Sequence, residues 1–114
     1  MKNDDSILKK LDHYCELFDN YQSLFTEKQC EYFKDYYFYD LSLSEIANNY
    51  SISRSAVYDV ISKMQIQLDE YEEKLGLVKN KQELNKTLDS YEEKANSENN
   101  KLAKDLIENL RKGI

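Results

Sequence analysis

The sequence predicts an all-α fold, and three observations support this prediction. Among 114 residues, glycine occurs twice and proline not at all, whereas sandwiches, barrels and glycine-loop nucleotide-binding folds need these residues at their turns. Charged residues make up 33% of the chain and hydrophobic residues 40%, which is typical of a helical protein with a solvated surface. Apolar residues also recur at spacings of three and four along most of the chain, as one face of a helix requires.

Two helices are predicted within residues 4–37. The first opens within residues 4–6, where Asp and Ser side chains can accept the free amide protons of a first turn. Thr26 and Gln29 form a capping-box pattern that starts the second helix. The side chains expected on the inner faces are Ile7, Leu11, Tyr14, Phe18 and Tyr21 in the first helix and Cys30, Phe33 and Tyr37 in the second.

A helix-turn-helix is predicted next. Ser42 with Glu45 opens a helix of about two turns, Ser53 opens a long one, and Ser51 occupies a left-handed turn position that favours glycine. Ala47 supplies the small side chain that the close crossing of the two helices requires. The apolar residues expected around the crossing are Leu43, Ile46, Tyr50, Ile52, Val57 and Ile61. Two ordinary helices joined by a short turn are the alternative.

The long helix from Ser53 to Leu75 would extend about 35 Å at 1.5 Å per residue. A small domain cannot cover this length, so its far half must pack on the first helix, on the tail or on another subunit. Gly76 is expected to end it in a left-handed conformation.

We therefore expect residues 1–77 to form the helix-turn-helix domain and residues 78–114 to form a C-terminal helical extension. The tail pattern favours two amphipathic helices broken at residues 96–100, with Asn80 and Glu83 as cap partners; one long helix is the alternative. The residues expected to pack the tail on the domain or to complete a homodimer are Leu68, Tyr71, Leu75, Leu84, Leu88, Tyr91, Leu102, Leu106 and Leu110.

The early exposed positions of the second helix of a helix-turn-helix are those that meet nucleic acid. Arg54 could pair with a phosphate or a guanine edge, and Tyr58 could stack or contact the backbone. The predicted nucleic-acid-binding residues are Ser44, Arg54, Ser55, Tyr58, Ser62 and Lys63. The aromatic run at residues 36–39 is expected to be core plus interface; a stacking surface for single-stranded RNA is the alternative.

Charge argues against strong duplex binding. Residues 1–75 contain 8 Lys/Arg and 15 Asp/Glu, a net charge of −7, whereas residues 76–114 contain 8 and 7, a net charge of +1. Phosphate neutralisation dominates affinity for nucleic acid, and the sequence pI near 4.8 is the reverse of a basic footprint. Any affinity for DNA is expected to be weak and salt-sensitive.

The residues that enzymes and metal sites use are scarce. With His13 as the single histidine there is no nucleophile–base pair, and His13, Cys15 and Cys30 match no zinc-site spacing. We expect no catalysis, metal or cofactor, and both cysteines as buried thiols in a reducing cytoplasm. No apolar stretch approaches the ~20 residues of a membrane span, and the N-terminus has no signal-peptide core.

Four segments carry a resemblance to a known family: Leu24–Gln29, Tyr36-Tyr37, Asp40–Ala47 and Ser53–Asp59. They resemble the helix-turn-helix of region 4 of bacterial sigma factors. They are more closely similar to the YlxM family, small proteins encoded beside signal recognition particle genes. The more specific parts are the stretches at residues 56–59 and 71–75. The resemblance covers residues 11–77, and the chain departs from the family pattern at Ser51 and Cys30.

The resemblance implies a non-enzymatic accessory or regulatory protein of the signal recognition particle pathway, acting with the particle's GTPase or its RNA. Two alternatives stay open. One is a DNA-binding transcriptional regulator, and the other is a dimeric protein–protein adapter that binds no nucleic acid.

Overall fold

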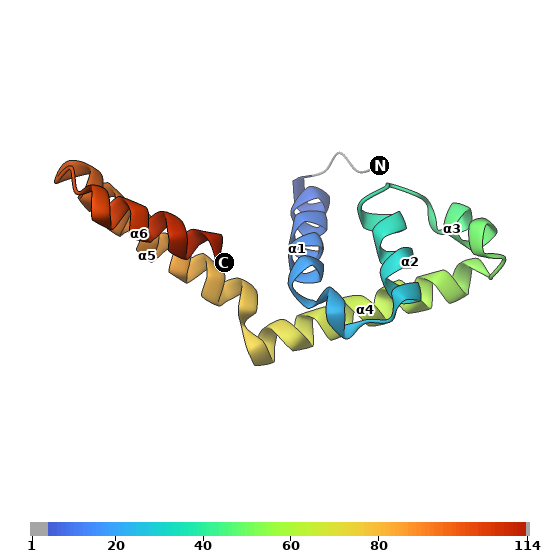
Figure 1. Cartoon of the computed structure of the whole chain (residues 1–114). Helices are drawn as coiled ribbons and strands as arrows, with labels where there is room; N and C mark the ends of the chain where they lie inside the picture. Colours follow the sequence, from blue (N-terminus) through green and yellow to red (C-terminus); the bar gives the residue numbers. More distant parts are fainter. Residues whose placement is uncertain (1–4, 114) are drawn as a thin grey trace. The chain divides into compact units, whose positions relative to one another are not determined.

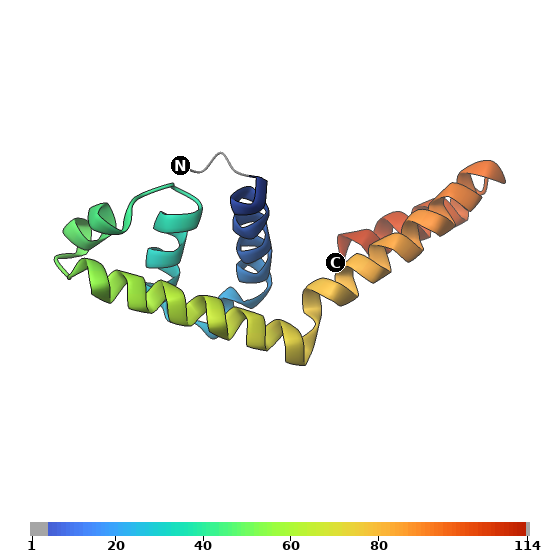
Figure 2. The ribbon, with the colours of Figure 1, turned by 180° about the vertical axis from the view of Figure 1, so that it is seen from behind.

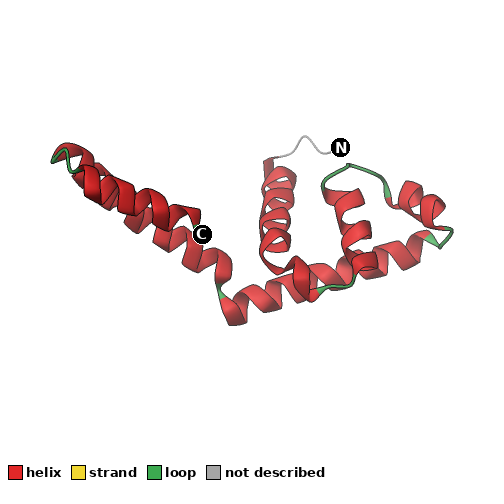
Figure 3. Cartoon of the chain, in the orientation of Figure 1, coloured by secondary structure: helices red, strands yellow, loops and turns green. Residues whose placement is uncertain are grey.

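A computed structural model describes the backbone of residues 5–113 and the side chains of residues 11–113. All regular structure in this range is helical, so the predicted all-α fold is confirmed (Figure 3). The chain divides into two compact units, an N-terminal unit of residues 1–75 and a C-terminal unit of residues 76–114. The helices are α1 (Asp5–Tyr21), a 3₁₀ turn (Gln22–Leu24), α2 (Glu27–Tyr37), α3 (Leu43–Tyr50), α4 (Arg54–Leu75), α5 (Leu77–Ser97) and α6 (Lys101–Lys112).

Side-chain caps start α2 and α3 where the sequence predicts them. Thr26 Oγ1 accepts a hydrogen bond from Gln29 N at 3.2 Å, and Gln29 Oε1 accepts one from Thr26 N at 2.8 Å. Ser42 and Glu45 form the same reciprocal pair, at 3.0 and 3.2 Å. Each box satisfies two amide protons that the first helical turn leaves without partners. The predicted start of α1 is described only from Asp5 on, and the side chain of Ile7 lies outside the described residues.

In the N-terminal unit, α1, α2 and α3 pack along one side of the long helix α4 (Figures 1 and 2). Phe18 of α1 stacks on Phe33 of α2 with ring centroids 4.4 Å apart. Among the described side chains of α1 to α4, the buried apolar ones are Leu17, Phe18, Tyr21, Tyr32, Phe33, Ile46, Ala47, Val57, Ile61, Met64 and Leu68.

The predicted inner face of α2 is only partly right. Tyr32 is buried beside Phe33, whereas the predicted positions Cys30 and Tyr37 are half-buried. Cys15 is also half-buried, so the expectation of buried thiols is wrong, although both cysteines are free. Tyr32 is buried where its ring packs edge-on against the ring of Tyr50 of α3, with centroids 4.7 Å apart.

The far half of α4 packs against α1. The first helix was one of three expected partners for this half, beside the tail and another subunit. Tyr14 OH donates a hydrogen bond to Asp69 Oδ2 at 2.9 Å, and Tyr21 OH donates one to Glu72 Oε1 at 2.7 Å. Burial and the contact with Asp69 raise the pKa of Tyr14 to about 12. These contacts fix α1 across the C-terminal turns of α4.

The turn between α3 and α4 has the predicted helix-turn-helix form. Ser51 is left-handed, with φ 56° and ψ 44°, and Ile52 N donates to Ala47 O at 3.0 Å. Ser53 Oγ then accepts a hydrogen bond from Ala56 N at 3.0 Å and caps α4. Ala47 is buried next to the crossing, so α3 can approach α4 closely.

The C-terminal unit is a pair of helices, as the broken tail pattern predicts. Asn99 is left-handed with φ 51°, and Asn100 Oδ1 accepts a hydrogen bond from Ala103 N at 3.1 Å to cap α6. Asn80 and Glu83 are not caps, however. Gly76 is left-handed as predicted, but α5 begins directly after it, so both residues lie inside that helix.

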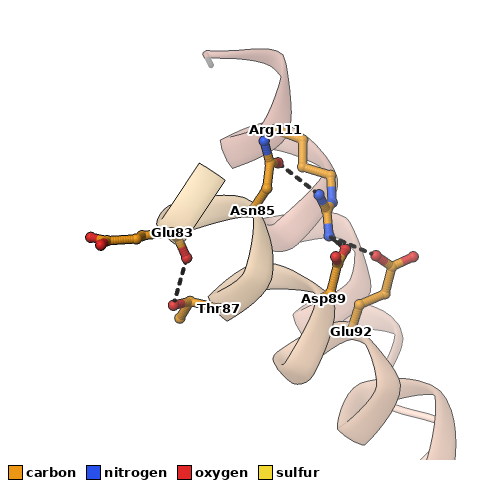
Figure 4. A network of polar contacts seen from close by, with 6 residues as sticks. All are labelled: Glu83, Asn85, Thr87, Asp89, Glu92 and Arg111. Carbon is orange, nitrogen blue, oxygen red and sulfur yellow. Dashed lines mark hydrogen bonds and ion pairs between the residues drawn. The ribbon is translucent and has the colours of Figure 1, made fainter. Parts of the chain in front are cut away.

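Arg111 links the two helices of this unit (Figure 4). Its guanidinium donates hydrogen bonds from α6 to three side chains of α5: Asn85 Oδ1 at 3.0 Å, Glu92 Oε2 at 3.1 Å, and Asp89. On the same helix, Thr87 Oγ1 donates to Glu83 O at 3.1 Å, a local contact within α5.

We expect Ser51→Gly to raise the free energy of unfolding by about 0.5–1 kcal/mol, because glycine adopts the left-handed conformation without steric cost. Urea denaturation followed by circular dichroism measures the change. Ser55→Gly is the matched control: it lies in the first turn of α4 and should be destabilising by a similar amount. A destabilised Ser51→Gly variant would contradict the assignment of strain to this turn.

We expect the stability contribution of the Tyr50 hydroxyl to be lost at alkaline pH. Its hydroxyl donates to Asp35 Oδ2 at 3.0 Å, and burial, with this contact, raises its pKa from 10.0 to about 12. A raised folded-state pKa gives stability that is complete below pH 10 and is lost as the pH rises to about 12. Tyr50→Phe should therefore lower the free energy of unfolding by about 1 kcal/mol at pH 8, and denaturation curves should show this difference shrinking between pH 10 and 12. Tyr39→Phe, at a position that is 68% exposed, should show no such trend.

Candidate nucleic-acid interface

The candidate interface begins with the exposed face of the first three turns of α4. Arg54, Tyr58 and Ser62 follow one another at intervals of four residues, and so share one row along the helix. Ser55 and Lys63 lie in the adjoining row. The side chains of Arg54, Ser55, Tyr58 and Lys63 are exposed, whereas Ser62 is half-buried. The structure therefore brings five of the six predicted residues to one helical surface.

The sixth predicted residue, Ser44, is exposed in the first turn of α3.

A local hydrogen bond changes the role expected of Ser55 on α4. Ser55 Oγ lies 3.2 Å from the capping hydroxyl of Ser53, so Ser55 belongs in part to the cap. Arg54 and Tyr58 are the larger exposed groups on this face.

Two hollows adjoin this face. The first, the polar hollow, has a volume of about 550 Å³ and is lined by Tyr36, Asp40, Leu41, Ser42, Leu43, Glu45 and Arg54. The second, the tyrosine hollow, has a volume of about 200 Å³ and is lined by Tyr36, Leu43, Tyr58, Ile61, Ser62 and Gln65. Tyr36 and Leu43 belong to both, so the two hollows are neighbours along the junction of α2, α3 and α4.

Tyr36, Leu43 and Gln65 are site residues that the sequence analysis did not assign. The aromatic run at residues 36–39 was the sequence feature that could have identified Tyr36. Because α2 ends at Tyr37, Phe38 and Tyr39 leave the helix and are 44% and 68% exposed. Only Tyr36 of the run lines the hollows.

A hydrogen bond behind the tyrosine hollow fixes its wall. The Gln65 side-chain amide donates to Tyr37 OH, and the Tyr37 ring stacks on Phe33 with centroids 4.4 Å apart. Burial raises the pKa of Tyr37 well above its usual value of 10.0, despite the opposing effect of the Gln65 hydrogen bond. Through these contacts with Gln65 and Phe33, Tyr37 supports the wall of the hollow.

The charges at the interface nearly cancel. Arg54 and Lys63 are accompanied on α4 by Asp59, and the polar hollow places Asp40 and Glu45 near Arg54. Asp40 stands in a left-handed conformation with φ 56°, between α2 and α3. This surface can contact a phosphate at Arg54, but it is not a basic patch.

A second candidate surface lies in the C-terminal unit. An apolar groove of about 450 Å³ runs between α5 and α6, where Leu88 is buried and Leu84, Tyr91, Leu106 and Leu110 are 44–60% exposed. Leu102 is 80% exposed and does not line the groove.

The three predicted packing residues of α4 differ in their surroundings. Leu68 is fully buried, the ring of Tyr71 lies 5.8 Å from that of Tyr21, and Leu75 is 53% exposed. Leu75 is therefore the most exposed of these three residues.

The described residues offer neither a metal site nor a membrane span. Among the side chains of residues 11–113, no cluster of three or more His, Cys, Asp or Glu is placed to hold a metal ion. No helix within residues 5–113 is long and apolar enough to cross a membrane. His13 is half-exposed and its Nε2 lies 3.2 Å from Asp69 Oδ1.

Comparison with known proteins agrees with the helix-turn-helix geometry. Residues 8–110 match the family described as "Putative helix-turn-helix protein, YlxM / p13 like". UPF0122 proteins from Bacillus cereus, Bacillus anthracis and Bacillus thuringiensis are each 51% identical to this chain over 77 residues, which cover 68% of the chain and 70% of each relative. The chain therefore belongs to the UPF0122 family of YlxM / p13-like helix-turn-helix proteins.

Proposed function

We propose that this protein is a non-enzymatic accessory or regulatory factor of the signal recognition particle pathway in the cytoplasm. Its N-terminal unit contacts nucleic acid through the exposed row of Arg54 and Tyr58 on α4. That row, on the second helix of a helix-turn-helix, is the observation that supports nucleic-acid contact best. The pathway itself is supported by the resemblance of residues 11–77 to proteins encoded beside signal recognition particle genes.

Charge favours a basic protein component of the particle over a duplex-DNA operator. A unit with a net charge of −7 gains little from phosphate neutralisation, and duplex binding depends on that contribution. A basic protein such as a nucleic-acid-binding GTPase domain would instead be attracted to the acidic unit. The helix-turn-helix geometry still supports the second candidate, a DNA-binding transcriptional regulator. The third, an adapter without nucleic acid, is favoured if neither RNA nor DNA binds.

We expect the purified protein to bind signal recognition particle RNA more tightly than duplex DNA or an unrelated RNA of equal length. Fluorescence anisotropy between 50 and 200 mM salt measures all three side by side. Arg54→Ala should weaken binding because one phosphate contact is lost. The slope of the logarithm of the binding constant against the logarithm of the salt concentration, called the salt slope below, should become shallower by about one unit. Lys79→Ala, in the other unit, is the charge-matched control. Tighter binding to duplex DNA would favour the transcriptional regulator instead, and binding to none of the three would leave the adapter.

We also propose that the apolar groove of the C-terminal unit holds the same unit of a second copy, forming a four-helix bundle. The unit has only 39 residues and a small buried cluster of Leu88, Ala95 and Ile107, with Ala103 half-buried against it. Helical units of this size rarely bury enough apolar surface to be stable without oligomerisation. A second copy supplies the missing apolar surface for the exposed leucines.

We expect a mass of twice 13.6 kDa in solution, and expect Leu106→Asp to produce a monomer because it places a charge in the apolar groove. Multi-angle light scattering measures both masses. Leu102→Asp is the matched control, since Leu102 is more exposed than Leu106 and lies outside the groove. A monomeric wild type, or a dimer that survives Leu106→Asp, would contradict this use of the groove.

A further inference from the structure

The tyrosine hollow has features that the helix-turn-helix alone does not require. Two aromatic rings line it, Tyr36 from α2 and Tyr58 from α4, with Leu43 and Ile61 as apolar lining and Ser62 and Gln65 as polar groups. Its volume of about 200 Å³ corresponds to roughly seven water molecules at ~30 Å³ each. It has room for one flat ring system and is too small for a base pair.

The two rings differ in how firmly they are held. Tyr36 packs edge-on against Tyr37 with centroids 5.1 Å apart, and Tyr37 is itself fixed by Phe33 and Gln65. Tyr58 is 56% exposed, and no aromatic ring of the described residues stacks on it. The hollow thus has one fixed aromatic wall and one whose face is open to a ligand.

Charge indicates what kind of ligand would use these rings. Stacking of a base on an aromatic side chain requires no positive charge and tolerates any base. In a unit with a net charge of −7, stacking is therefore the contribution to nucleic-acid affinity that remains strong where phosphate contacts are weak. A base inside a duplex cannot reach the hollow, whereas RNA recognition commonly uses unpaired bases stacked on aromatic side chains.

We propose that the tyrosine hollow binds a single unpaired nucleobase of an RNA, held against the rings of Tyr58 and Tyr36. This inference rests on the proposed function and deepens it by naming the feature of the RNA that is recognised. The Ser62 hydroxyl can donate or accept a hydrogen bond at the edge of the base. The adjoining polar hollow shares Tyr36 and leads to Arg54, which can contact the phosphate of a flanking nucleotide.

The test uses the full chain and an RNA hairpin with one bulged 2-aminopurine, compared with the same hairpin without the bulge. We expect the bulged hairpin to bind about tenfold more tightly, since stacking of one base has effects of this order. The fluorescence of the bulged base should change on binding, as stacking alters its environment.

Tyr58→Ala should abolish the preference for the bulge, because it should weaken binding of the bulged hairpin about tenfold more than binding of the fully paired hairpin. Tyr58→Phe keeps the ring and should retain the preference for the bulge. Arg54→Ala should weaken binding of both hairpins and make the salt slope shallower by about one unit. Tyr39→Ala is the matched control, because Tyr39 is even more exposed than Tyr58 and does not line the hollow.

Equal affinity for the two hairpins, or a Tyr58→Ala variant that still prefers the bulge, would overturn the nucleobase site and leave the proposed function standing. Failure of the wild type to bind any RNA would overturn both.

Discussion

The close approach of α3 to α4 at Ala47 is the contact on which the N-terminal unit depends. Ala47 provides the small side chain at the crossing, and its carbonyl oxygen accepts the hydrogen bond from Ile52 N that closes the turn. Val57 and Ile61 are buried in the same cluster, so a larger side chain at position 47 would force the helices apart. The crossing determines which face of α4 stays exposed, and so it determines that Arg54 and Tyr58 share a surface.

The features that the sequence predicts correctly are those set by local interactions. A capping serine or threonine acts within one turn, so the starts of α2, α3 and α4 could be placed from three or four residues each. The left-handed positions at Ser51 and Gly76 follow from local backbone geometry in the same way. By contrast, the inner face of α2 was misjudged because this helix lies between two partners. Phe33 contacts α1 and Tyr32 contacts α3, so the buried side chains of α2 do not lie along a single stripe.

The hollows and the link at Arg111 could not be predicted because they join residues distant in sequence. Tyr36 and Gln65 come from different helices, and a pattern search along either helix finds only half of the wall. Arg111 likewise bonds to side chains 19 to 26 residues away. The expectation of caps at Asn80 and Glu83 failed for another reason: Gly76 ends α4 and also precedes the first residue of α5, so no linker remains for a separate cap.

The distribution of acidic residues along α4 determines which of them oppose a polyanion. Asp69 lies about 22 Å from Arg54 along the helix axis, far beyond the Debye length of about 8 Å at physiological ionic strength. The acidic residues at that end, which also hold the hydroxyls of Tyr14 and Tyr21, therefore repel a ligand at Arg54 only weakly. Asp40, Glu45 and Asp59 are much nearer, and these three carboxylates slightly exceed the positive charge of Arg54 and Lys63. A ligand at this surface consequently meets a nearly neutral aromatic face, where shape and stacking contribute more to affinity than charge.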